Sequence, residues 1–162
     1  MRNYKPEPVP DSVWQKPSHF IAFGFGSGAI PFAPGTFGTL VAVPIYLALQ
    51  DIGLAYYILL MIAIIIGSSY LSDKVSKDTK THDHQGMCLD EIVGFLVTMT
   101  AAPKGFWWIV FGFVLFRFFD IVKPWPINYI DKRVGGGFGM ILDDVVAGIF
   151  SLIIIQITYY FI

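Results

Sequence analysis

Long apolar runs alternate with short polar connections along the chain. The apolar runs occupy residues 37–50, 54–72, 92–103, 105–119 and 145–162. Residues 54–72 come close to the roughly 20 residues that a helix needs to cross a bilayer. Pro44 lies inside the first run and predicts a kink there. The third run is short, so it either extends back through Asp90 and Glu91 or is re-entrant.

Two further segments lack this pattern. Residues 1–19 are rich in proline and charge, which predicts a polar, irregular N-terminal arm. Residues 20–36 are apolar but interrupted by glycine and proline, so they cannot form one continuous helix. We therefore predict an all-α, multi-pass integral membrane helical bundle of about four to five spans. Residues 20–162 form its single membrane-embedded catalytic domain, with a candidate re-entrant segment in the glycine-rich part.

Composition supports a membrane protein. Of the 162 residues, 55% are hydrophobic and only 14% are charged, and the mean hydropathy is +0.63. A soluble domain carries about 25% charged residues. The net charge of −1 gives no reason to expect a nucleic-acid partner, and the single cysteine, Cys88, excludes an internal disulfide or a cysteine metal cluster.

The basic residues predict the orientation of the bundle. If the spans alternate, ten of the eleven Lys and Arg residues lie on one side, together with eleven of the twelve acids. The positive-inside rule places that side in the cytoplasm. The candidate chemistry is therefore expected on the cytoplasmic face.

Acidic residues concentrate at helix ends on that face. They are Asp83, Asp90, Glu91, Asp120, Asp143 and Asp144. One pair of acids at a helix N-terminus is explained by the helix dipole alone. Two pairs with two more acids repel one another unless cations lie between them, and clustered carboxylates suit Mg²⁺. The segments CLDEIVGF (88–95) and ILDDVVAGIF (141–150) are alike, either as a weak internal repeat or as two helices that begin in the same way.

Glycines and cations complete the candidate site. The segment GFGSGAIPFAPGTFGTL (24–40) offers backbone N–H groups for a phosphate, although small residues also serve close packing of membrane helices. In FRFFDIVKPWPI (116–127), Arg117, Asp120 and Lys123 follow at three-residue spacing and share one helical face if the helix persists. Lys132 and Arg133 are either further phosphate ligands or interfacial anchors.

The segments GFGSGAIPFAPGTFGTL, DHQGMCLDEIVGF and FRFFDIVKPWPINYIDKRVGGGFGMILDDVVAGIF resemble the phosphatidylglycerophosphatase A family, which are bacterial membrane lipid phosphatases. The resemblance runs from about residue 20 to residue 150. It implies Mg²⁺-dependent removal of the terminal phosphate from phosphatidylglycerophosphate, giving phosphatidylglycerol and inorganic phosphate. It also implies location in the bacterial cytoplasmic membrane, with the phospholipid and the bilayer as partners; the oligomeric state stays open.

Chemistry at the matching positions predicts the individual roles. The expected metal ligands are Asp83, Asp90, Glu91, Asp143 and Asp144, with Asp143 nearer to the ion than Asp144. Catalysis is assigned to Glu91, which positions or deprotonates the attacking water, and to Asp90, Asp143 and Asp144. The substrate-binding residues are Arg117, Asp120, Lys123, Arg133, Thr36, Gly35 and Gly26. The alternatives are another carboxylate–metal phospholipid enzyme and a small membrane transporter whose acids bind a coupling ion.

Overall fold

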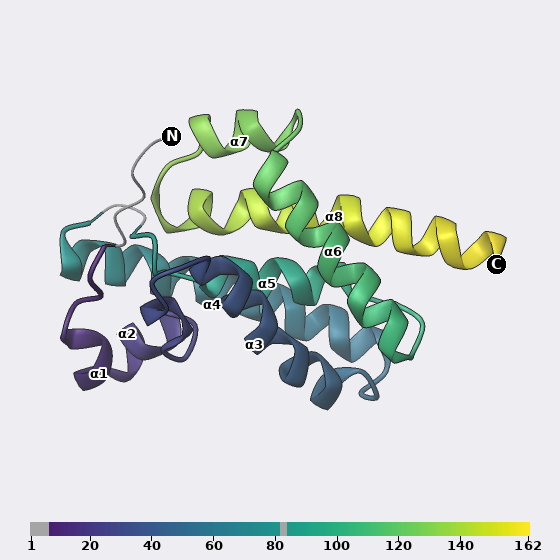
Figure 1. Ribbon diagram of the computed structural model, residues 1–162, viewed down its shortest axis with the longest axis horizontal. Helices are drawn as coiled ribbons and strands as arrows, with labels where there is room; N and C mark the ends of the chain where they lie inside the picture. Colours follow the sequence, from purple (N-terminus) through teal and green to yellow (C-terminus); the bar gives the residue numbers. More distant parts are fainter. Residues whose placement is uncertain (1–6, 82–83) are drawn as a thin grey trace.

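The computed structural model describes residues 7–81 and 84–162 (Figure 1). Within these residues the secondary structure is entirely helical, which confirms the all-α prediction. The helices are α1 (Ser12–Gln15), α2 (Pro17–Ala22), the 3-10 helix η1 (Ser27–Ala29), α3 (Pro34–Leu49), α4 (Leu54–Thr79), α5 (Leu89–Thr98), α6 (Phe106–Val122), α7 (Ile127–Arg133) and α8 (Gly136–Phe161).

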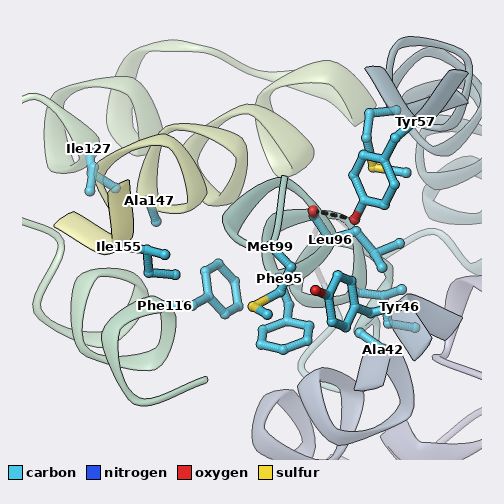
Figure 2. Close-up of a cluster of buried hydrophobic side chains, with 12 residues drawn as sticks. Ala42, Tyr46, Tyr57, Phe95, Leu96, Met99, Phe116, Ile127, Ala147 and Ile155 are labelled. Atoms are coloured by element: carbon cyan, nitrogen blue, oxygen red, sulfur yellow. Dashed lines mark hydrogen bonds between the residues drawn. The ribbon is translucent and has the colours of Figure 1, made fainter. Parts of the chain in front are cut away.

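The short helix α5 is the centre of the bundle. Eight of its ten residues are buried, and it contacts α3, α4, α6 and α8. Figure 2 shows Phe95 and Leu96 of α5, with Met99 directly after the helix, packed among side chains of the surrounding helices. The Tyr57 hydroxyl of α4 donates a hydrogen bond of 2.7 Å to the Leu96 carbonyl. Because α5 is covered on all sides, the residues at its start are held by the whole bundle.

Glycine permits the close crossing of α5 and α8. A Cβ atom added to Gly94 would lie 2.8 Å from the Asp144 carbonyl oxygen, and one added to Gly148 would lie 2.5 Å from the Gly94 carbonyl oxygen. Real Cβ atoms do not approach backbone oxygens so closely, so a side chain at either position would push the two helices apart. This crossing brings the acidic parts of α5 and α8 together.

Within residues 7–81 and 84–162, two helices are long and apolar enough to cross a membrane, Leu54–Thr79 and Gly136–Phe161. They correspond to the predicted runs 54–72 and 145–162. The other predicted runs also form helices: 37–50 overlaps α3, 92–103 overlaps α5, and 105–119 overlaps α6. The third run does extend back through Asp90 and Glu91.

Two expectations about helix limits were wrong. Residues 12–19 are not irregular, because Val13 and His19 are buried and the His19 ring lies 2.9 Å from Ser12 Oγ and 3.2 Å from Asp78 Oδ2, which holds α1 and α2 on the bundle. The LDD segment does not begin a helix, because α8 starts at Gly136, two turns earlier. The division into an N-terminal arm and one membrane-embedded domain stays a prediction.

Candidate active site

A polar cavity of about 200 Å³ lies where the start of α5, the end of α6 and the first half of α8 meet. It is lined by His84, Gln85, Met87, Asp90, Glu91, Asp120, Lys123, Asp131, Met140, Asp143 and Asp144. Six of these eleven residues are acids. The cavity therefore collects, from helices far apart in sequence, most of the acids that were predicted to form a site.

Three of the carboxylates lie close enough together to hold one metal ion. One ligand oxygen from each of Asp90, Glu91 and Asp144 lies within 4.8 Å of the other two. Asp90 and Glu91 belong to the first turn of α5, where Asp90 Oδ1 accepts a 3.0 Å hydrogen bond from the Glu91 backbone N–H. Glu91 Oε2 is buried and has no hydrogen-bond partner among the described residues. A buried carboxylate oxygen without a donor is costly unless a cation meets it.

Charge repulsion among the acids of the cavity also favours a bound cation. The carboxylates of Asp120, Glu91 and Asp143 all repel that of Asp144, which is 3% exposed. The largely buried Glu91 carboxylate is also repelled by that of Asp120, although Asp90 and Arg117 stabilise its charge. A divalent cation among these oxygens would remove the repulsion.

Arg117 is an internal partner of the acids. Its Nη1 donates to Asp120 Oδ2 at 2.5 Å and lies 3.8 Å from Glu91 Oε1. The side chains of all three residues are largely buried. The predicted pairing of Arg117 with Asp120 on one face of α6 is therefore present. The Arg117 Nε group is buried without a partner in the described structure, and Arg117 is not among the residues that line the cavity.

Lys123 also lines the cavity, next to Asp143 and Asp131. It ends α6 in the left-handed conformation, with φ of 43°, and its Nζ lies 2.6 Å from Asp143 Oδ2 of α8 and 2.8 Å from Asp131 Oδ1 of α7. Burial alone would lower the pKa of Lys123, but the hydrogen bonds to Asp131 and Asp143 raise it well above its ordinary range. The ammonium group is therefore fully charged inside the cavity.

The two aspartates of LDD have different neighbours. Asp144 faces Asp90 and Glu91, whereas Asp143 pairs with Lys123. The expected ligand Asp143 is thus not a member of the three-carboxylate group, although it lines the same cavity. Asp83 lies outside the described residues.

The predicted glycine and cation ligands are dispersed. Gly35, at the start of α3, touches the site, because a Cβ added there would lie 2.0 Å from Glu91 Oε1 and 3.1 Å from Arg117 Nη1. Thr36 is half-buried and does not line the cavity. Gly26 lies instead beside Trp14 and Phe20. The Arg133 guanidinium stands over the Tyr129 ring, 5.4 Å from its centroid.

Asp131 and His84 line the cavity but were not among the predicted site residues. Asp131 follows Lys123 by eight residues across a proline turn, a spacing with no regular periodicity, so no sequence signal pointed to it. His84 lies in the loop before α5. Its Nδ1 accepts a 3.0 Å hydrogen bond from the Gly86 backbone N–H, so the ring shapes the loop that leads into α5.

The fold and the cavity define an all-helical protein whose apolar bundle carries a carboxylate-rich site at one end. A model of the family "Phosphatidylglycerophosphatase A" matches residues 20–159. The chain therefore belongs to the phosphatidylglycerophosphatase A family, as its sequence resemblance predicted.

Individual relatives agree with this assignment. The chain is 42% identical over 137 residues to phosphatidylglycerophosphatase A of Escherichia coli (strain K12), covering 83% of this chain and 79% of the relative. It is 39% identical over 146 residues to the Haemophilus influenzae protein of the same name, covering 89% and 90%. It is also 33% identical over 145 residues to a putative phosphatidylinositol-3-phosphatase of Bacteroides thetaiotaomicron, covering 85% and 91%. No solved structure matches the chain.

Proposed function

We propose that this protein removes the terminal phosphate of phosphatidylglycerophosphate, giving phosphatidylglycerol and inorganic phosphate, and that it requires Mg²⁺. The observation that carries the proposal is the group of Asp90, Glu91 and Asp144 in one cavity with Lys123. Carboxylates and a buried ammonium together suit a phosphate monoester that arrives with a divalent cation. Membership of a family named for this phosphatase gives the substrate.

The donor set fits Mg²⁺. The three carboxylates are hard oxygen ligands, and the unpartnered Glu91 Oε2 is a buried atom that a cation would satisfy. We assign the ion to Asp90, Glu91 and Asp144. When bound, Mg²⁺ supplies neutralisation of the phosphate charge and activation of water.

The protein side chains have separate roles in the reaction. Lys123 Nζ binds phosphate oxygens and stabilises charge in the transition state, and Arg117 holds the carboxylates of Glu91 and Asp120. Glu91 orients the attacking water and accepts its proton at a carboxylate oxygen. The new bond joins the water oxygen to phosphorus, the phosphorus–glycerol oxygen bond breaks, and the glycerol oxygen takes up the proton that Glu91 accepted. Asp120 and Asp143 position the two cations.

We further propose that the bundle crosses the bacterial cytoplasmic membrane several times, with the cavity at the cytoplasmic surface. Only 17% of the apolar window of α4 is buried within the protein, so most of this helix presents apolar side chains outward. Lipid tails would cover that surface. The acids lie at one end of the bundle rather than midway along it, which favours an enzyme at an interface over a transporter.

Similarity to a protein named as a putative phosphatidylinositol-3-phosphatase identifies a second phosphate monoester to compare. Phosphatidylinositol 3-phosphate carries its phosphate on a bulky ring, whereas the terminal phosphate of phosphatidylglycerophosphate is on a flexible chain. We expect the cavity of about 200 Å³ to favour the slimmer headgroup.

The test is phosphate release by the purified protein from each lipid in mixed micelles, with Mg²⁺ and with a chelator. We expect release from phosphatidylglycerophosphate that stops with chelator and returns when Mg²⁺ is added back. Equal release with and without chelator would contradict the proposed Mg²⁺ requirement. Absence of release from either lipid would favour the transporter alternative.

A further inference from the structure

Lys123 is bound on both sides before any substrate arrives. Its ammonium group donates to Asp143 on α8 at 2.6 Å and to Asp131 on α7 at 2.8 Å. These two carboxylates occupy positions around Nζ that phosphate oxygens would otherwise take, because an ammonium group has three donors. A phosphate that binds Lys123 with more than one oxygen must therefore displace one of them.

The two carboxylates differ in how readily they can leave. The Asp143 side chain is 7% exposed, whereas that of Asp131 is 41% exposed. Asp131 belongs to the seven-residue helix α7, which packs on α8 at the periphery of the bundle (Figure 1). Once released from Lys123, Asp131 gains water, whereas Asp143 would stay buried and unpaired. A phosphate that binds Lys123 is therefore expected to displace Asp131 rather than Asp143.

We propose that Asp131 is an internal competitor of the phosphate group: its carboxylate holds Lys123 in place when the site is empty and yields that position when a phosphate monoester or inorganic phosphate binds. The inference rests on the proposed phosphate-binding role of Lys123. Asp131 in this way lowers the affinity for every phosphate ligand, including the product, and favours product release over product retention.

Two matched controls come from the other exposed Asp–Lys pairs of the described residues. Asp51 pairs with Lys104, and Asp73 of α4 pairs with Lys77 at 2.5 Å. None of these four residues lines the cavity. Asp51→Asn and Asp73→Asn remove the same charge as Asp131→Asn, so they report the effect of net charge. The amide oxygen in Asp73→Asn can still accept the hydrogen bond that Asp73 accepts from the Gly137 backbone N–H. Asp131→Glu keeps the competing carboxylate and serves as the conservative variant.

The experiment measures inorganic phosphate binding to the purified, Mg²⁺-supplemented protein in detergent by phosphorus NMR line broadening. We expect Asp131→Asn to bind inorganic phosphate about tenfold more tightly than wild type, because one nearby like charge is removed. Asp51→Asn, Asp73→Asn and Asp131→Glu should bind within twofold of wild type. Unchanged or weaker binding in Asp131→Asn, an equal gain in the two control variants, or no binding in any variant would overturn the inference.

Hydrolysis of phosphatidylglycerophosphate by the same wild-type preparation separates the two proposals. Tighter phosphate binding in Asp131→Asn without any hydrolysis by wild type would support the competitor role and contradict the proposed reaction. Hydrolysis by wild type with unchanged phosphate binding in Asp131→Asn would support the proposed reaction and contradict the competitor role.

Discussion

The segments LDE (89–91) and LDD (142–144) look alike in sequence but have different positions in the structure. Asp90 and Glu91 lie in the first turn of a ten-residue helix that is buried on all sides. Asp143 and Asp144 lie two turns inside a 26-residue helix. Both acids of the first pair join the three-carboxylate group, whereas the second pair is divided between that group and Lys123. Equal local sequence therefore does not give equal roles.

The largest expected effect distinguishes the two members of LDD. Asp144→Asn removes one of the three clustered carboxylates, and we expect turnover of phosphatidylglycerophosphate to fall on the order of 1,000-fold, since metal ions contribute several kcal/mol to such reactions. The measurement is kcat in mixed micelles at saturating Mg²⁺. The neutral, nearly isosteric side chain should leave the helical circular dichroism unchanged. A variant that keeps a tenth of wild-type turnover would contradict the assignment.

The next effect concerns the glycine that touches Glu91. Gly35→Ala places a Cβ atom 2.0 Å from Glu91 Oε1, so the carboxylate must move, and we expect about a hundredfold lower kcat because misplacement by about 1 Å costs that much. Gly67→Ala is the matched control, since nothing lies within 4 Å of its added Cβ and the residue is also helical. Equal activities of the two variants would show that Glu91 is not held in a required position.

A smaller effect is expected for the other aspartate of LDD. Asp143→Asn weakens the hold on Lys123 and leaves the three-carboxylate group intact, so we expect about a tenfold loss in kcat/KM, since a hydrogen bond to a charged group contributes about 1.5–3 kcal/mol. The rise in KM should exceed the fall in kcat, because Lys123 binds the phosphate in the ground state as well. A loss as large as that of Asp144→Asn would make the two aspartates equivalent.

The smallest effect lies at the opposite end of the bundle. Asp51 and Lys104 form an exposed ion pair far along the helices from the cavity. Exposed pairs contribute about 0–1 kcal/mol to stability, so Asp51→Asn should leave turnover within twofold of wild type and lower the melting temperature by a few degrees at most. Thermal unfolding and phosphate release on the same sample check both values. A strong loss of turnover would show that residues at this end of the bundle also take part in the reaction.

The sequence was informative where chemistry depends on residue type and periodicity. The apolar runs located the long helices, and five of the six predicted acids lie in the described cavity. The extended glycine segment was less predictable, because Gly35 meets Glu91 only through the crossing of α3 and α5. Asp131 and the division of Asp143 from Asp144 depend on the chain turn after Lys123 and on the packing of α8, which no local pattern encodes.

Metal binding itself tests the central claim most directly, namely that Asp90, Glu91 and Asp144 hold one divalent cation. Mn²⁺ can replace Mg²⁺ as a probe, and its free concentration is measured by electron paramagnetic resonance during titration of the purified protein. We predict one Mn²⁺ site in wild type that Asp144→Asn abolishes and Asp143→Asn retains. Loss of the site in Asp143→Asn with retention in Asp144→Asn would contradict the account.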